Sequence, residues 1–337
     1  MKHYDVVALG ELLIDLTQNE KSIQGNPMLE ANPGGAPCNV LALLQKLGNS
    51  TAFIGKVGCD GFGAQLEETL KETGISTAGL RWDEYVHTTL AVVHTLPGGD
   101  RDFSFYRNPG ADMRLTAKEL DGEMIRNCKL FHFGTLSMTD EPVRSATYKA
   151  ISIAEEAGAL RSFDPNLRAP LWSSVDAAKD QVLYGMAHCD ILKISDNEIQ
   201  WLTEEENFDD GIRWIKERFP QIQLILLSMG KDGSRAYSGS IYAEVPALTF
   251  VNTIETTGAG DTFFGGVLYH VLQWGLRDYT EKELKQMLSF ANAAAAIITT
   301  KKGALRVMPG KQEILDLMEQ AAQYMQFENK GENYEAV

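Results

Sequence analysis

The sequence predicts an α/β fold with a largely parallel main sheet and a second, smaller β-sheet standing apart from it. The main sheet is predicted because apolar, strand-like runs alternate with segments of helical period that are ten or more residues long. The run 224–227 is apolar without alternation, as expected for a strand that is covered on both faces. The smaller sheet is predicted because no helix separates the strand-like runs 88–95 and 102–107.

The elements of the main sheet follow one another in a regular order along the chain. Strands are predicted at 4–10, 51–57, 130–134, 160–164, 190–194 and 224–228, and helices at 37–48, 61–73, 140–158 and 262–272. Pro37 suits the first turn of its helix, which ends at Gly48, and Gly74 stops the next helix. These two helices therefore each have a local signal that fixes at least one end.

The smaller sheet interrupts this order. The runs 88–95 and 102–107 are joined by a hairpin-type turn at 96–101, which contains Pro97, Gly98 and Gly99. We predict one α/β domain over residues 1–326, with a β-lid formed by about 15–33 and 88–112. Residues 327–337 are predicted to be a polar tail.

Charge and composition exclude several classes of protein. The chain has 46 acidic and 31 basic residues, which gives a formal net charge of −15. A field of that sign repels nucleic-acid backbones and anionic lipids, so neither nucleic acid nor a membrane is expected as a partner. The four cysteines lie far apart with no metal-ligand spacing, and the first residues do not form a signal peptide. The predicted location is the cytoplasm.

The stretch 255–261 carries the clearest chemical signal. Gly258, Ala259 and Gly260 precede an amphipathic helix, whose free N–H groups and dipole attract an anion such as phosphate. Asp261 then places a carboxylate beside that anion, which a general base for an attacking hydroxyl would explain. The same residues also fit a tight turn in which Asp261 only stabilises the first helical turn.

Three further segments lie where a ligand can be bound in such a fold. Gly34, Gly35 and Asn39 belong to a glycine cluster whose N–H groups and amide can bind the hydroxyls of a polyol, although an ordinary loop fits as well. Asp15 ends the first strand segment, and Arg168 follows the strand 160–164 in a segment that fits a structural turn as well. Ligands gather at the carboxyl ends of strands in α/β sheets.

Two charged residues have a structural and a functional interpretation. Ser195 and Glu198 form the pattern of a helix capping box, and the alternative is that Glu198 organises water around a Mg²⁺ held mainly by nucleotide phosphates. Arg107 ends the predicted hairpin. It fits either an exposed arginine at a strand end or a guanidinium that closes with a lid onto a transferring phosphoryl group.

Two motifs in this order resemble those of the ribokinase-type (PfkB) carbohydrate kinases. The first is Gly34-Gly35-x-Pro37-x-Asn39, and the second is Thr256-Thr257-Gly258-Ala259-Gly260-Asp261 followed by Gly265-Gly266. The resemblance runs from residue 4 to about 309. Within this family, the chain is most similar to fructokinases, and segments that carry this similarity include 10–15, 105–107 and 164–168. It implies a ribokinase-like three-layer sandwich with a β-lid, and transfer of the ATP γ-phosphoryl group to the 6-hydroxyl of D-fructose.

The resemblance also assigns roles to individual residues. It makes Asp261 the general base and Gly258–Gly260 the anion hole, with ATP and Mg²⁺ as expected ligands. Sugar or lid contacts are implied for Asp15, Gly34, Gly35, Asn39 and Arg107, with Arg168 near the phosphates. Nucleotide contacts are implied for Lys193, Ser228, Gly230, Gly233 and Asn292. Glu198 matches the acid of the family's N-x-x-E element, with Ser195 in the place of the asparagine.

The resemblance leaves some properties open. Glu255 stands where relatives usually have Asp, which in several of them helps to bind a monovalent cation, so activation by K⁺ is left open. The β-lid can serve as the surface of a homodimer. A kinase for another sugar or sugar acid, such as 2-keto-3-deoxygluconate, and a non-catalytic sugar-binding relative are the alternative functions.

Overall fold

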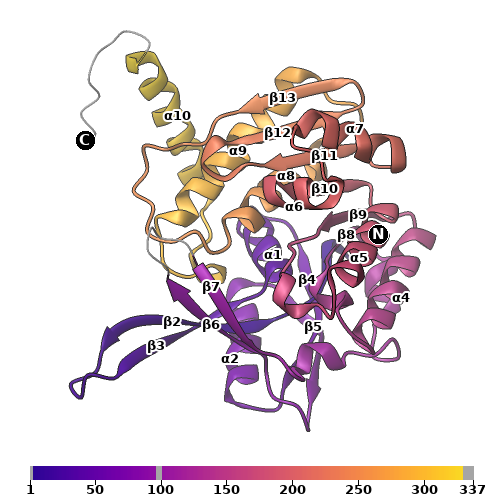
Figure 1. The fold of residues 1–337 in the computed structure, drawn as a ribbon, viewed down its shortest axis with the longest axis vertical. Coiled ribbons are helices and arrows are strands. Elements are labelled where there is room, and N and C mark those ends of the chain that lie inside the picture. Colours follow the sequence, from indigo (N-terminus) through magenta and orange to yellow (C-terminus); the bar gives the residue numbers. More distant parts are fainter. Residues whose placement is uncertain (1–2, 96–100, 329–337) are drawn as a thin grey trace.

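The computed structural model describes residues 3–95 and 101–328, and its centre is a nine-stranded sheet (Figure 1). In spatial order the strands are β13 (Ile241–Val245), β12 (Ser234–Ser238), β11 (Leu224–Ser228), β10 (Ile191–Ser195), β9 (Leu160–Asp164), β8 (Cys128–Gly134), β1 (Tyr4–Leu9), β4 (Thr51–Gly58) and β5 (Ser76–Asp83). Neighbours from β11 to β5 pair in parallel, and β12 and β13 add an antiparallel edge. The predicted α/β class with a mainly parallel sheet is confirmed.

Helices cover both faces of this sheet. One face carries α1 (Ala36–Lys46), α2 (Gly61–Thr73), α8 (Ala259–Trp274), α9 (Glu281–Thr299) and α10 (Lys311–Glu328). The other carries α3 (Gly122–Arg126), α4 (Val143–Glu156), α5 (Val175–Ala187), α6 (Asp196–Thr203) and α7 (Phe208–Arg218). The side chains of successive residues in a strand point to opposite faces of the sheet, and each face has its own hydrophobic core. In β1, Val6 and Ala8 pack against the first set of helices, and Val7 and Leu9 pack against the second.

A separate four-stranded sheet forms the predicted lid, and it projects from one end of the molecule (Figure 1). Its order is β3 (Pro27–Gly34), β2 (Leu13–Lys21), β6 (Leu90–Thr95) and β7 (Arg101–Tyr106). Strand β2 is antiparallel to β3 and parallel to β6. Residues 96–100 of the predicted hairpin turn, and 329–337 of the predicted tail, lie outside the described residues.

Most predicted elements agree with the structure to within two residues. The helices predicted from residues 140 and 262 are exceptions, because α4 begins at Val143 and α8 begins at Ala259. Glu141 precedes Pro142, and a residue before proline is disfavoured in helical conformation. No helix among residues 3–95 and 101–328 is long and apolar enough to cross a membrane.

Candidate functional site

Two cavities lie where the parallel strands of the main sheet end. The large cavity has a volume of about 600 Å³ and the small cavity about 400 Å³. Both are lined by Asn166, Arg168, Lys193 and Gly260, so they meet at these four residues. Strands β9 and β10 deliver three of them, and the first turn of α8 delivers the fourth.

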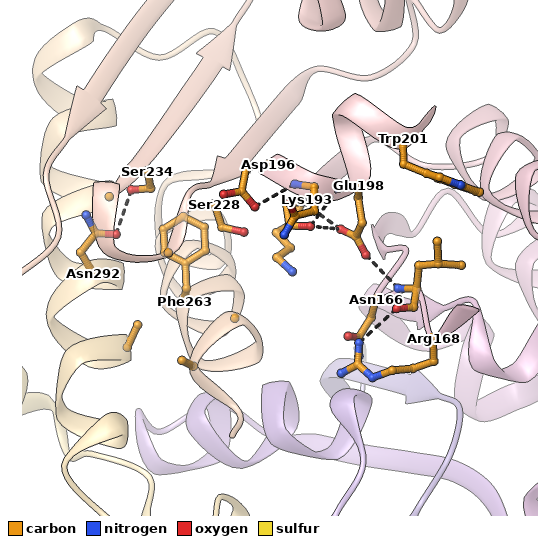
Figure 2. Close-up of a pocket in the computed structure, with 18 residues that line it drawn as sticks. Asn166, Arg168, Lys193, Asp196, Glu198, Trp201, Ser228, Ser234, Phe263 and Asn292 are labelled. Carbon is orange, nitrogen blue, oxygen red and sulfur yellow. Dashed lines mark hydrogen bonds between the residues drawn. The ribbon is translucent and has the colours of Figure 1, made fainter. Parts of the chain in front are cut away.

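The large cavity contains all five residues predicted as nucleotide contacts. These are Lys193, Ser228, Gly230, Gly233 and Asn292, and Glu198 lines the same space (Figure 2). The parallel register of β10 and β11, which places Ser195 beside Ser228, brings their loops together. Asn292 comes from α9, where its Oδ1 accepts a hydrogen bond from Ser234 at 2.8 Å.

Most of the predicted sugar contacts line the small cavity. Its wall includes Asp15, Gly35, Asn39, Arg168, Gly258, Gly260 and Asp261. Gly34 is not in this wall, but it lies against Asp15, and a Cβ on Gly34 would come 2.3 Å from Asp15 Oδ2. Gly35 has φ of 129°, a conformation that L side chains rarely adopt, and it precedes the first residue of α1.

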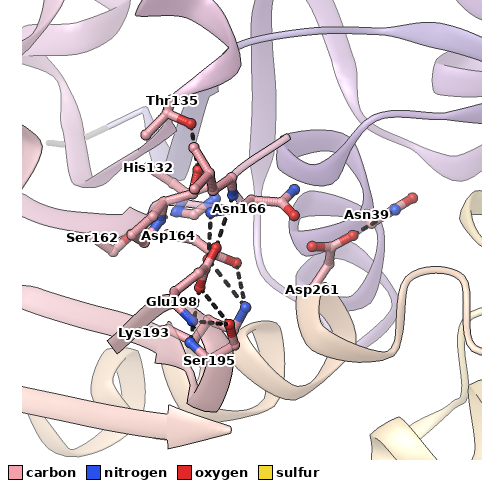
Figure 3. Close-up of polar contacts among 12 residues, drawn as sticks. Asn39, His132, Thr135, Ser162, Asp164, Asn166, Lys193, Ser195, Glu198 and Asp261 are labelled. Carbon is pink, nitrogen blue, oxygen red and sulfur yellow. Dashed lines mark hydrogen bonds and ion pairs between the residues drawn. The ribbon is translucent and has the colours of Figure 1, made fainter. Parts of the chain in front are cut away.

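Asp261 and Asn39 meet at the small cavity (Figure 3). Gly258, with φ of 75°, lets the chain turn into α8, so that Asp261 falls in the first turn of this helix. The Asn39 Nδ2 donates a hydrogen bond of 2.8 Å to Asp261 Oδ2. Burial raises the pKa of Asp261, and Asn39, Lys193 and Arg168 partly oppose this rise.

Lys193 is a buried cation at the junction of the two cavities. Its Nζ donates to both carboxylate oxygens of Asp164, at 3.1 and 3.0 Å. Burial alone would lower the pKa of Lys193, but the carboxylates of Asp164, Glu198 and Asp261 raise it. Burial raises the pKa of Asp164 to about 7, although Lys193 opposes the rise. The ammonium group of Lys193 therefore stays charged where the cavities meet.

Glu198 makes the predicted capping box at the start of α6. Its Oε2 accepts from the N–H of Ser195 at 2.9 Å, and the Ser195 hydroxyl accepts in return from the N–H of Glu198. Its other oxygen, Oε1, accepts from the N–H of Leu167 at 2.8 Å. Burial opposes ionisation, but Lys193 and the N–H donors lower the pKa of Glu198 overall. Glu198 is thus a charged carboxylate that also faces the large cavity.

The structure places the Arg107 side chain in a buried ion pair, which decides between its two interpretations. The exposed-arginine interpretation is wrong, because its side chain is 2% exposed and its Nε pairs with Asp112 Oδ2 at 2.7 Å. The guanidinium also donates to Thr139 Oγ1 and to the Leu136 carbonyl. Within the described residues, Arg107 lines neither cavity. Contact with a substrate stays a prediction for this residue.

The sequence reasoning did not assign two residues of the site. Asn166 lines both cavities with φ of 43°, which is rare outside glycine. Glu11 lines the small cavity although it is buried. A polar residue just after a strand was the available signal for both, because the carboxyl end of a parallel strand is where ligands gather.

Comparisons with known proteins identify the family of the chain. The model of the pfkB family of carbohydrate kinases matches residues 4–310. The chain is 41% identical over 318 residues to fructokinase-1 of Zea mays, covering 94% of this chain and 98% of the relative. Fructokinase-2 of Oryza sativa subsp. japonica is 40% identical over 322 residues, covering 94% of each chain.

Solved structures with the same fold contain ligands of the expected kind. A fructokinase from Xylella fastidiosa with bound ATP has a TM-score of 0.85 and 29% identity, covering 96% of this chain and 100% of that one. A fructokinase from Vibrio cholerae O395, bound to fructose, ADP and calcium, has a TM-score of 0.83 and 29% identity, covering 94% and 99%. The chain therefore belongs to the pfkB family of carbohydrate kinases, and it is an ATP-dependent carbohydrate kinase.

Proposed function

We propose that this kinase is a fructokinase, which transfers the γ-phosphoryl group of ATP to the 6-hydroxyl of D-fructose. The observation that carries the proposal is that the two cavities meet beside Asp261. The large cavity would hold ATP, and the small cavity would hold the sugar with its hydroxyl at the junction. The choice of fructose is supported by the identity of 41% to a plant fructokinase.

Asp261 is proposed as the general base. Asn39 holds Oδ2, so Oδ1 can accept the proton of the sugar hydroxyl. The raised pKa makes the carboxylate a better proton acceptor. As the proton moves to Asp261, the sugar oxygen forms a bond to the γ-phosphorus, and the bond from that phosphorus to the β,γ-bridging oxygen breaks. ADP leaves with the electron pair of that bond.

The chain also supplies positive charge where the phosphoryl group would pass. Gly258–Gly260 form the start of α8, where free N–H groups and the helix dipole favour an anion. Lys193 and Arg168 line both cavities and add cationic groups. These fixed donors stabilise the charge that the phosphoryl group carries in the transition state.

The residues fit a Mg²⁺ ion that is held mainly by phosphates. Among the described residues, no group of three His, Cys, Asp or Glu side chains could hold a metal ion by itself. Glu198, a charged carboxylate in the large cavity, is the residue we propose to bind such an ion through water. Bound Mg²⁺ would neutralise phosphate charge.

A homodimer formed through the lid is also proposed. The lid and its ends expose apolar side chains, which are Ile23, Met28, Leu29 and Tyr106. Sedimentation analysis of the wild type and of Leu29→Asp would test this, since a charge in an apolar interface shifts a dimer towards monomer. An unchanged sedimentation coefficient in the variant would count against the lid as the interface.

The test of the function is ADP release from Mg-ATP with D-fructose, D-glucose, D-ribose, adenosine and 2-keto-3-deoxygluconate. We expect preference for fructose by a factor of about ten or more, roughly 1.4 kcal/mol of transition-state discrimination. Turnover of another substrate would keep the mechanism and replace the sugar. Sugar-dependent thermal stabilisation without ADP release would identify a non-catalytic relative.

A further inference from the structure

Glu11 is a buried carboxylate that the mechanism above does not use. It lies in the loop between β1 and β2, the residue is 4% exposed, and it lines the small cavity. Its Oε1 accepts a hydrogen bond of 2.8 Å from the backbone N–H of Ala36. Burying a carboxylate costs free energy unless the group is well bonded, so its place in the fold calls for a physical reason.

The hydrogen bond from the Ala36 N–H to Glu11 caps the N-terminus of α1, which has no side-chain cap of its own. Ala36 is the first residue of α1, and the N-cap residue Gly35 has no side chain to accept from the free N–H groups there. Glu11 accepts one of them from a different loop. The two backbones fit closely, because a Cβ on Gly35 would come 2.4 Å from the Glu11 carbonyl oxygen.

The capped turn of α1 carries the side chain that holds Asp261. Asn39 closes the first turn by donating its N–H to the Gly35 carbonyl at 3.0 Å, and its Nδ2 donates to Asp261. The Asn39 Oδ1 is buried without a hydrogen-bond partner among the described residues. The amide is therefore held by its bond to Asp261 and by the position of the helix, and a shift of the first turn would misplace it.

We infer that Glu11 is a positioning residue, which fixes the first turn of α1 and thereby sets the geometry between Asn39 and Asp261. This inference rests on the proposed function, in which Asp261 takes the proton of the sugar. The charged or titratable groups that act on Glu11 are Arg107, which follows β7, and Asp112, in the 3₁₀ turn Ala111–Arg114. Glu11 in turn acts on Cys38, in α1. The side chains that shift the pKa of Asp261 are Asn39, Lys193 and Arg168, so we infer that Glu11 acts on Asp261 through the first turn of α1 and Asn39.

The test compares Glu11→Ala with Glu11→Gln in steady-state kinetics. Alanine removes the acceptor, whereas glutamine keeps an acceptor oxygen for the Ala36 N–H. Since small displacements of catalytic groups are costly, we expect Glu11→Ala to lower kcat by roughly 10- to 100-fold with KM for ATP unchanged. Glu11→Gln should restore most of the rate.

Ser174→Ala is the matched control for loss of a helix cap. The Ser174 hydroxyl accepts from the N–H of Ala177 at the start of α5, at 3.1 Å, and α5 lines neither cavity in the described part of the chain. We expect this variant to lose stability and keep kcat. If Glu11→Ala behaves in the same way, Glu11 is a structural cap and the inference is overturned.

A second readout does not depend on turnover. The titration of the Asp261 carboxyl can be followed by ¹³C NMR and assigned by its loss in Asp261→Asn. Because the Asn39 bond lowers the pKa of Asp261, we expect that pKa to rise in Glu11→Ala as it does in Asn39→Ala. An unchanged pKa in Glu11→Ala would overturn the inference even if the wild type phosphorylates no sugar. A raised pKa in an inactive wild-type background would support it and reject only the proposed function.

Discussion

Arg107 and Asp112 form a buried ion pair where the lid joins the main sheet, with Nε and Oδ2 2.7 Å apart and both side chains 2% exposed. Thr89, just before β6, also donates to Asp112, from its Oγ1 to Oδ1 at 2.5 Å. The guanidinium reaches the main body through the Leu136 carbonyl. These contacts connect one end of both β6 and β7 to the rest of the molecule.

We expect Arg107→Ala to lower the free energy of unfolding by about 3–5 kcal/mol, because Asp112 is left charged and buried without its partner. Urea denaturation measures this loss. The double variant Arg107→Ala/Asp112→Ala should lose less than the sum of the two single variants, since the pair is coupled. Additive losses would show that the ion pair does not stabilise the lid.

Asp261→Asn should lose on the order of 10²- to 10⁴-fold in turnover, because the amide cannot accept the proton of the sugar hydroxyl. The variant keeps the shape of the side chain and an oxygen that can accept from Asn39. We therefore expect fructose to raise the thermal midpoint of the variant as it does for the wild type. Turnover near the wild-type rate would return Asp261 to the role of a residue that only stabilises the first turn of α8.

The stability of the protein should depend on pH through Glu11. Burial raises the pKa of Glu11 from 4.5 to about 7, so the folded state holds a proton that the unfolded chain releases at lower pH. Its contribution to the free energy of unfolding is complete below about pH 4.5 and is lost as the pH rises to about 7. Urea denaturation at pH 5 and pH 7.5 measures this change.

Glu11→Gln is the control for that measurement, because glutamine does not titrate and other groups are the same in both proteins. We expect the difference in free energy of unfolding, wild type minus Glu11→Gln, to fall between pH 5 and pH 7.5. Asp164, whose pKa burial also raises to about 7, cancels in this difference. A difference that stays constant with pH would mean that Glu11 titrates near its usual value.

The length of the Glu255 side chain leads us to expect that K⁺ does not activate the enzyme. Its Oε2 accepts a hydrogen bond from the N–H of Gly303 at 3.5 Å, and its carboxylate is one methylene longer than the usual Asp. We expect equal kcat in K⁺ and in choline buffers of the same ionic strength. Glu255→Asp should make the rate depend on K⁺. Stimulation of the wild type by K⁺ would show that the longer side chain still admits the ion.

Local patterns in the sequence determined the fold class and one part of the site. Helices and strands follow from apolar periodicity, and the glycines before Asp261 predicted a helix start because their effect acts within one turn of chain. The predicted nucleotide contacts were carried over from the family: Lys193, Ser228, Gly230 and Gly233 lie in or next to β10, β11 and β12, whereas Asn292 lies in α9. They all line the large cavity.

Only the tertiary structure decided which distant side chains meet. Asn39 and Asp261 are 222 residues apart, and their hydrogen bond depends on α1 and α8 packing on the same face of the sheet. The burial of Arg107 and the bond from Ala36 to Glu11 depend likewise on how the lid and the loops pack. Periodicity describes each element by itself, whereas these contacts arise from the order of strands in the sheet and the space between layers.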